Sequence, residues 1–285
     1  MSTRRSRKPT GPQERPSQTA EWHTGEHRGY RIQCLRPYQR FRGTEMPWDK
    51  LADLRRMTEE VTKSSRSRKV VKLAAGHFGT PLELYVKRYN FKTWYGPYLR
   101  MTRRSRAREE FELGWVLKDA GIRTPTPVWV AEQMGTPSRY SLLATEAIPA
   151  AENIWERWMR LDEEECRLDL MRAVGHFLLL LHERGLYHDD CKAGHVLVRL
   201  ESPSDPREFF VIDLLGCGLL GRLSRLRRAK NLYQMLHQFL PRHDDLGFRE
   251  HHREEFLEAY GGSKAEGARW SRWVDRVGRL KGRRI

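Results

Sequence analysis

The segment from Leu181 to Val198 constrains the fold of this chain more than any other part of it. It starts at the end of an apolar stretch with helical spacing, passes through the loop HDDCKAGH of residues 188–195, and ends in a β-like run. A second β-like run ends at Asp213 in the sequence VIDL. The pattern predicts a helix, a loop and then a β-hairpin of residues 196–200 and 209–213. Asp190 and Asp213 are therefore expected about one short strand pair apart.

The part of the chain before this segment is rich in β-like runs. They span residues 68–74, 82–89, 126–132 and 141–146. In the second run Leu82, Leu84 and Val86 alternate with polar residues, which is typical of a half-buried strand. The alternation leaves Lys87 on the opposite face from these apolar residues.

Two amphipathic helices are predicted from their end signals. Ser105 is expected to cap a helix that runs to Ala120, where Gly121 ends it. The second helix is expected to begin at Asp162, with Glu165 completing a capping box, and to end at Gly185. The sequence from Leu223 onward is mainly helical in pattern.

The formal net charge of +16 is the strongest feature of the composition. Basic residues concentrate in the N-terminal tail, in residues 103–108 and in residues 222–230. Such charge predicts a polyanionic partner, which is a phosphorylated glycolipid, an anionic membrane surface or nucleic acid. A solvated basic surface is the alternative for each cluster. Because no RNA- or DNA-binding motif is visible, nucleic acid ranks last.

The N-terminal region and the cysteines bear on the compartment. Residues 1–28 are rich in Ser, Pro, Gly and Arg, and we expect a disordered basic tail there. No apolar run approaches the ~20 residues of a membrane span, and no secretory signal follows the basic start. The four cysteines are widely spaced and form no disulfide-like framework. These features predict a cytoplasmic protein.

The order of these elements matches the protein-kinase pattern, in which HxDxxxxN is followed by a short β-hairpin and a second Asp. In that pattern one carboxylate orients the acceptor hydroxyl and the other holds the metal that bridges the ATP phosphates. Here His195 stands where Asn is usual. The layout predicts an α+β, two-lobed protein kinase-like fold. A β-rich, nucleotide-binding N-lobe is expected over 29–147 and a helical C-lobe over 148–285.

Two departures from the kinase pattern indicate a family. Cys191 directly after Asp190, with His195 in the Asn position, resembles the HxDCxxxH loop of the lipopolysaccharide kinase (Kdo/WaaP) family. The IDL of residues 212–214 resembles its metal-binding motif, and the sequence AGIRTPTP of residues 120–127 resembles its GxxTPxP turn. The resemblance spans residues 62–239. It implies an ATP- and Mg²⁺-dependent kinase that phosphorylates a heptose or Kdo hydroxyl of the lipopolysaccharide inner core, and so an acidic glycolipid or sugar acceptor.

The resemblance also implies roles by position. Asp190 would orient the acceptor hydroxyl and accept its proton late in the transfer, and Asp213 would ligate magnesium. Lys87 would neutralise the α- and β-phosphates of ATP, with Glu110 as its partner from the helix. Glu109 shares most of that helix face and stays open as the alternative.

The remaining candidates concern the catalytic loop and the phosphates. His195 is expected in the site, either as a ligand of magnesium or through a hydrogen bond to Asp190 or a phosphate. The phosphate-covering loop of residues 63–68 has no glycine, so Ser65 and Arg66 are expected to contact phosphates directly. His188 is expected to brace the loop through backbone hydrogen bonds, and Cys191 to pack inward.

Two other functions stay open. A kinase of this fold can act on a protein Ser/Thr side chain or on a small metabolite. The high charge and the missing glycines also permit a catalytically weak pseudokinase or a nucleic-acid-binding module.

Overall fold

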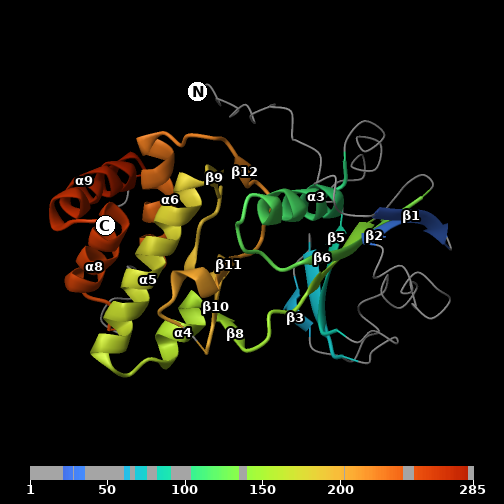
Figure 1. The fold of residues 1–285 in the computed structure, drawn as a ribbon, viewed down its shortest axis with the longest axis horizontal. Helices are drawn as coiled ribbons and strands as arrows, with labels where there is room; N and C mark the ends of the chain where they lie inside the picture. Colours follow the sequence, from blue (N-terminus) through green and yellow to red (C-terminus); the bar gives the residue numbers. More distant parts are fainter. Residues whose placement is uncertain are drawn as a thin grey trace.

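The structure is a computed structural model. It describes residues 22–27, 29–35, 61–64, 68–75, 82–90, 104–134, 140–201, 203–239 and 247–281. In these ranges an antiparallel sheet lies on one side of the molecule and a group of helices on the other (Figure 1). The predicted phosphate contacts Ser65 and Arg66 lie outside the described residues.

The large sheet has seven antiparallel strands in the order β1-β2-β6-β7-β5-β4-β3. The strands are β1 (Trp22–His27), β2 (Tyr30–Leu35), β3 (Val61–Ser64), β4 (Arg68–Leu73), β5 (Leu84–Asn90), β6 (Pro127–Gln133) and β7 (Tyr140–Glu146). The four β-like runs of the sequence thus form strands β4 to β7. The predicted disorder of residues 1–28 is wrong for residues 22–27, since β1 pairs along its whole length with β2.

One face of this sheet is closed by its own apolar side chains, and the other receives α3 (Arg106–Asp119). Leu84 and Val86 of β5 are fully buried on the first face, as their alternation predicts. On the second face Phe111 of α3 packs in a cluster with Tyr89 of β5. The predicted N-cap of α3 is confirmed, because Ser105 Oγ accepts a hydrogen bond from the Arg108 amide.

The second part of the molecule is built from helices around a separate apolar cluster. The helices are α4 (Ile154–Arg160), α5 (Glu164–Glu183), α6 (Arg225–His237), α8 (Glu250–Gly261) and α9 (Lys264–Leu280). The capping box predicted at Asp162 and Glu165 is wrong. Leu161 is buried, and its carbonyl accepts a hydrogen bond from the Arg167 side chain, so α5 begins only after Glu163. Within the described ranges, every helix is too short or too polar to span a bilayer.

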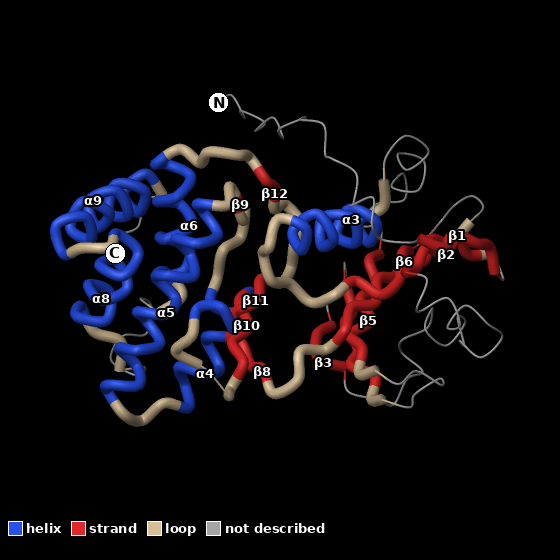
Figure 2. Tube along the Cα trace, in the orientation of Figure 1, coloured by secondary structure: helices blue, strands red, loops and turns tan. Residues whose placement is uncertain are grey.

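Short strands lie between the helices and the large sheet (Figure 2). β8 (Ala151–Asn153), β10 (Val196–Arg199) and β11 (Phe209–Val211) form one sheet, and β9 (Leu186–Tyr187) pairs with β12 (Gly218–Leu219). The predicted hairpin is therefore present as β10 and β11, with Val196 opposite Val211. Its second strand ends two residues earlier than predicted, because Asp213 takes a left-handed backbone conformation with φ 59°.

Antiparallel strands and helices together confirm the α+β class. The boundary between two lobes at residue 147 stays a prediction. Leu113 and Leu117 of α3 belong to the cluster of the helical part, while Phe111 belongs to the sheet side. α3 therefore connects the sheet to the helical part through packing.

The turn after α5 gives a test of the local packing. Gly185 has φ +78°, and a Cβ there would lie 2.3 Å from the carbonyl oxygen of Gly221. Gly185→Ala is expected to lower the free energy of unfolding by about 3 kcal/mol, because left-handed strain and a backbone overlap add. Gly221→Ala is the matched control, since φ is +63° but nothing lies within 4 Å of its Cβ. We expect a loss of about 1 kcal/mol there in chemical denaturation. Equal losses in the two variants would contradict the packing described.

Candidate active site

A lysine–glutamate ion pair joins the large sheet to α3. Lys87 Nζ of β5 lies 2.5 Å from Glu110 Oε1, and Glu110 is only 3% exposed. The Tyr89 hydroxyl donates a hydrogen bond to the other carboxylate oxygen of Glu110. Lys87 and Tyr89 are two residues apart on one strand and therefore point to the same face. Glu110 rather than Glu109 is thus the partner of Lys87.

This pairing predicts different results for two neighbouring glutamates. Glu110→Gln is expected to lower kcat/KM for ATP on the order of 10²-fold, because Lys87 loses the carboxylate that fixes its ammonium group. Glu109→Gln is the matched control and is expected to leave kcat/KM unchanged. Steady-state kinetics with varied ATP measures both, after circular dichroism has shown that the variants fold. Equal effects would mean that Glu109 shares the role.

The loop before β10 is fixed by the buried side chain of His188. His188 Nε2 lies 3.1 Å from the Ile212 carbonyl oxygen, and its Nδ1 accepts a hydrogen bond from the Asp190 amide at 3.2 Å. Burial lowers the pKa of His188, so the ring is neutral, with its proton on Nε2. The predicted bracing role of His188 is confirmed. It connects the loop of Asp190 directly to the segment of Asp213.

Asn231 of α6 holds the same loop from the other side. Its Nδ2 donates to the His188 carbonyl at 2.6 Å, and its Oδ1 accepts from the His188 amide at 3.3 Å. The same Oδ1 contacts Nε2 of His182 on α5 at 3.2 Å. The buried polar groups behind the loop are therefore paired with one another.

His195 lies between the two aspartates. Its Nδ1 donates a hydrogen bond to the Asp190 backbone carbonyl at 2.8 Å, and its Nε2 lies 3.4 Å from Asp213 Oδ2. Nδ1 is thus used within the loop, and Nε2 is the ring nitrogen that faces the carboxylate of Asp213. His195 therefore lies between the two aspartates, and its part in the site stays a prediction.

Asp213 is held beside positive groups. Arg68 Nη1 at the start of β4 lies 2.5 Å from Asp213 Oδ1. Burial acts to raise the pKa of Asp213, but the Arg68 guanidinium, with His195 and Lys87, outweighs it and holds that pKa below its usual value. Asp213 is therefore ionised and attracts a cation.

Asp190 faces a cavity beside α6. Its carboxylate is about half exposed and lies 2.8 Å from Lys192 Nζ. The cavity has a volume of about 440 Å³. Its lining consists of Asp190, Lys192, Tyr233, Gln234, His237 and Lys281. Asp190 therefore lines a space large enough for a sugar.

These residues fit a magnesium ion. Mg²⁺ in phosphate-transfer sites binds one or two carboxylates and completes its shell with phosphate oxygens and water. Asp213 supplies an ionised carboxylate, and His195 Nε2 lies 3.4 Å from one of its oxygens, so the ring in its neutral form would add a nitrogen ligand. Arg68 supplies the positive charge at Asp213 in this structure.

Arg68 is the site residue that sequence reasoning missed. It belongs to the predicted phosphate-covering loop, for which Ser65 and Arg66 were the expected contacts. The register of β4 with β5 was the available signal, because Arg68 pairs with Tyr89, the residue that bonds Glu110. Cys191 lies inward as predicted, and burial raises the pKa of its thiol to about 12. It is therefore a packing residue and not a nucleophile.

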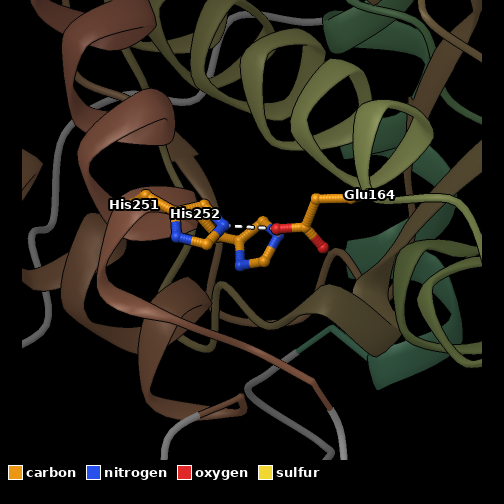
Figure 3. A group of neighbouring side chains, drawn as sticks. All are labelled: Glu164, His251 and His252. Carbon is orange, nitrogen blue, oxygen red and sulfur yellow. Dashed lines mark hydrogen bonds and ion pairs between the residues drawn. The ribbon is translucent and has the colours of Figure 1, made fainter.

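A second group of possible metal ligands lies at the first turns of α5 and α8. Figure 3 shows Glu164, His251 and His252 pointing toward one another. His252 is fully buried, and its Nδ1 accepts a hydrogen bond from the Arg249 amide at 3.0 Å. Its Nε2 lies 3.0 Å from Glu164 Oε1 but makes no hydrogen bond, whereas His251 Nε2 is hydrogen-bonded to the same oxygen. Glu164 therefore connects α5 to α8 through the two histidines, and three possible ligand atoms lie together there.

Comparison with known proteins adds to this geometry. The model of the lipopolysaccharide kinase (Kdo/WaaP) family matches residues 52–260, well over half of the chain. A solved structure described as WaaP in complex with acyl carrier protein matches with a TM-score of 0.58 and 20% sequence identity. The match covers 87% of this chain and 97% of that one, and it confirms the predicted fold class. No match was found among curated proteins.

Proposed function

Because the chain belongs to the lipopolysaccharide kinase (Kdo/WaaP) family, a family of phosphotransferases that act on sugar hydroxyls, we propose that it phosphorylates a heptose or Kdo hydroxyl of the lipopolysaccharide inner core. ATP is the proposed donor. The observation that carries the proposal is the bridge from Asp190 through His195 to Asp213. His195 Nδ1 also lies 3.7 Å from Asp190 Oδ2, which supports the proposed division of roles between an acceptor-facing carboxylate at Asp190 and a metal-binding carboxylate at Asp213.

On the nucleotide side, Lys87 places a positive charge against the α- and β-phosphates. Glu110 and Tyr89 hold the ammonium group in place, since all three are linked by short hydrogen bonds. Bound Mg²⁺ would neutralise charge that develops on the transferred phosphoryl group. Asp213 would hold it, with His195 as a second ligand.

Arg68 has two proposed roles in turn. Without nucleotide it balances the charge of Asp213. A cation in that place would free the guanidinium for the phosphates, whose oxygens its fork of donors matches.

On the acceptor side, Asp190 accepts a hydrogen bond from the reacting hydroxyl and takes its proton as the new O–P bond forms. Lys192 moderates the charge of Asp190 before the acceptor binds. The cavity that Asp190 lines also contains the polar side chains of Tyr233, Gln234 and His237, which suit the hydroxyls of a sugar. An acidic sugar such as Kdo would in addition meet Lys281.

A kinase of this family fold that acts on a protein side chain or a metabolite is the alternative. Mass spectrometry of the core glycolipid from a strain lacking this protein separates the proposals. We expect a loss of 80 Da, one phosphate, from the inner-core fragment, and restoration by the intact gene but not by the Asp190→Ala variant. An unchanged core glycolipid would reject the proposed acceptor.

A further inference from the structure

Several cations of the basic clusters seen in the sequence are paired with carboxylates in the folded protein. Arg104 and Arg108 of the cluster at residues 103–108 are bonded to Glu112 and Glu132. Lys230 of the cluster at residues 222–230 is bonded to Asp189 at 2.9 Å. These three cations are partly neutralised and serve the fold. They are weak candidates for an anion-binding surface, whereas Arg225 of the second cluster is exposed and lines a groove with α9.

Exposed cations instead gather along α9. A groove of about 440 Å³ runs between α9 and the first turn of α6. We call it the α9 groove; it is lined by Arg225, Glu266, Arg269, Trp270, Arg272, Trp273, Arg276 and Arg279. Arg269 is bonded to Glu266. In the part of the chain that the structure describes, no carboxylate pairs with Arg225, Arg272, Arg276 or Arg279. Four uncompensated guanidinium groups therefore line one groove.

Large apolar side chains are also exposed on the two helices that form the groove. Trp273, Arg276 and Leu280 follow one another at intervals of three and four residues, which places them on one stripe of α9, with Trp273 partly buried against the core of the helical part. Leu280 is 74% exposed, and Leu226 in the first turn of α6 is 51% exposed. The Arg276 guanidinium lies 5.5 Å from the centre of the Trp273 ring. Exposed arginine and leucine beside a partly buried tryptophan on one helix are typical of a helix that binds a membrane surface.

The C-terminal end of α9 contributes to both the groove, through Arg279, and the cavity of Asp190. Lys281 follows Leu280 directly and lines the cavity of Asp190. Its ammonium group lies 4.9 Å from the centre of the Tyr233 ring, and Tyr233 lines the same cavity. One end of α9 therefore connects the basic groove to the cavity of Asp190.

We propose that the α9 groove docks this protein on a membrane surface that carries anionic phospholipids. The arginines contact lipid phosphates, and Trp273 and Leu280 enter the boundary between headgroups and acyl chains. An acidic protein would satisfy the arginines equally, but it offers no reason for exposed Leu280 and Leu226. The further consequence, that docking turns the Asp190 cavity toward a lipid-anchored sugar, rests on the proposed function; the docking itself does not.

Sedimentation of the full chain with vesicles tests the docking. The vesicles are phosphatidylcholine alone or with 30 mol% phosphatidylglycerol, about a third of the lipid, with no ATP and no glycolipid present. We expect binding to the anionic vesicles only. The triple variant Arg272→Gln/Arg276→Gln/Arg279→Gln is expected to bind on the order of 100-fold more weakly, since each basic residue near such a surface contributes about 1 kcal/mol. Leu280→Asn is expected to give a smaller loss that persists at high salt.

The matched control removes three other exposed cations that make no ion pair within the described residues, in Arg106→Gln/Arg184→Gln/Lys264→Gln. It is expected to keep most of the vesicle binding, because these residues lie outside the α9 groove. Equal losses in the two triple variants would overturn the proposal, since net charge alone would then explain binding. Unchanged binding of the α9 variant would overturn it as well, and would assign the arginines to another anionic partner.

Activity on a soluble acceptor separates this proposal from the proposed function. With ATP and delipidated core oligosaccharide, the α9 triple variant is expected to retain wild-type turnover. Asp190→Ala is expected to bind anionic vesicles as wild type does. If vesicle binding follows these expectations while no sugar is phosphorylated, the proposed function fails and the docking surface stands. If sugar is phosphorylated but vesicles do not bind, the reverse holds.

Discussion

Replacement of Asp190 by alanine is expected to lower kcat at least 10³-fold while ATP binding is retained. Asp190 lines the cavity proposed to hold the acceptor, and in the proposed role the variant would remove both the orientation of the hydroxyl and the acceptor of its proton. The carboxylate is about half exposed and bonds only to Lys192 and at longer range to His195, so the fold does not depend on it. Turnover of labelled ATP with core oligosaccharide measures the loss. A thermal shift caused by ATP and Mg²⁺ measures the retained binding.

Asp189 offers a matched control for this variant. It precedes Asp190, is more exposed, and pairs with Lys230 on the surface of α6. Asp189→Ala is expected to keep turnover within a factor of about three, because an exposed pair of this kind contributes little. If Asp190→Ala retained appreciable turnover, or Asp189→Ala lost it, the assignment of the acceptor-facing carboxylate would be wrong.

Replacement of Asp213 by alanine is expected to abolish transfer as well, for a different reason. Asp213 is the ionised carboxylate that Arg68, His195 and Lys87 surround. Without it the metal has no carboxylate ligand, so the thermal shift with ATP and Mg²⁺ should disappear together with activity. Loss of nucleotide binding thus distinguishes Asp213→Ala from Asp190→Ala.

Asp205 provides the control for the second replacement. It is an aspartate of the same hairpin, and its carboxylate bonds only Arg207 in its own turn. Asp205→Ala is expected to keep both activity and the metal-dependent shift. Intact Mg²⁺-dependent ATP binding in Asp213→Ala would contradict the metal role of Asp213.

Elements that depend on a short sequence pattern could be predicted from the sequence. Alternation of apolar residues predicts β5 and places Lys87 opposite Leu84 and Val86, and the side chain of Ser105 predicts the start of α3. The loop around Asp190 could be predicted because His188, Asp190 and Asp213 stand at fixed distances along the sequence motif. Contacts between a β-strand and a helix far apart in the sequence cannot be predicted from such a motif.

Glu110 illustrates this limit. On a helix, neighbouring residues point only about 100° apart, so Glu109 and Glu110 both suit one face. The choice depends on Tyr89, whose hydroxyl reaches the same carboxylate as Lys87. Similarly, Arg68 contacts Asp213 across 145 positions of sequence, and only the pairing of β4 with β5 brings it there.

Two local errors have physical causes of the same kind. The capping box at Asp162 has the right residue types, but burial of Leu161 and the hydrogen bond from Arg167 to its carbonyl move the helix start to Glu164. β1 has no strong strand pattern and forms because β2 offers it a full set of backbone partners. In both places a tertiary contact overrides the local preference.

We propose that this chain transfers a phosphoryl group from ATP to an inner-core sugar, with Asp190 on the acceptor side and Asp213 on the metal side. The most direct test incubates the purified protein with γ-labelled ATP, Mg²⁺ and delipidated core oligosaccharide, and then identifies the labelled product by mass spectrometry. We expect one labelled phosphate on a heptose or Kdo residue, formed by the wild type and by Asp189→Ala but not by Asp190→Ala or Asp213→Ala. Label on protein or on a small metabolite, with an unlabelled oligosaccharide, would contradict the account.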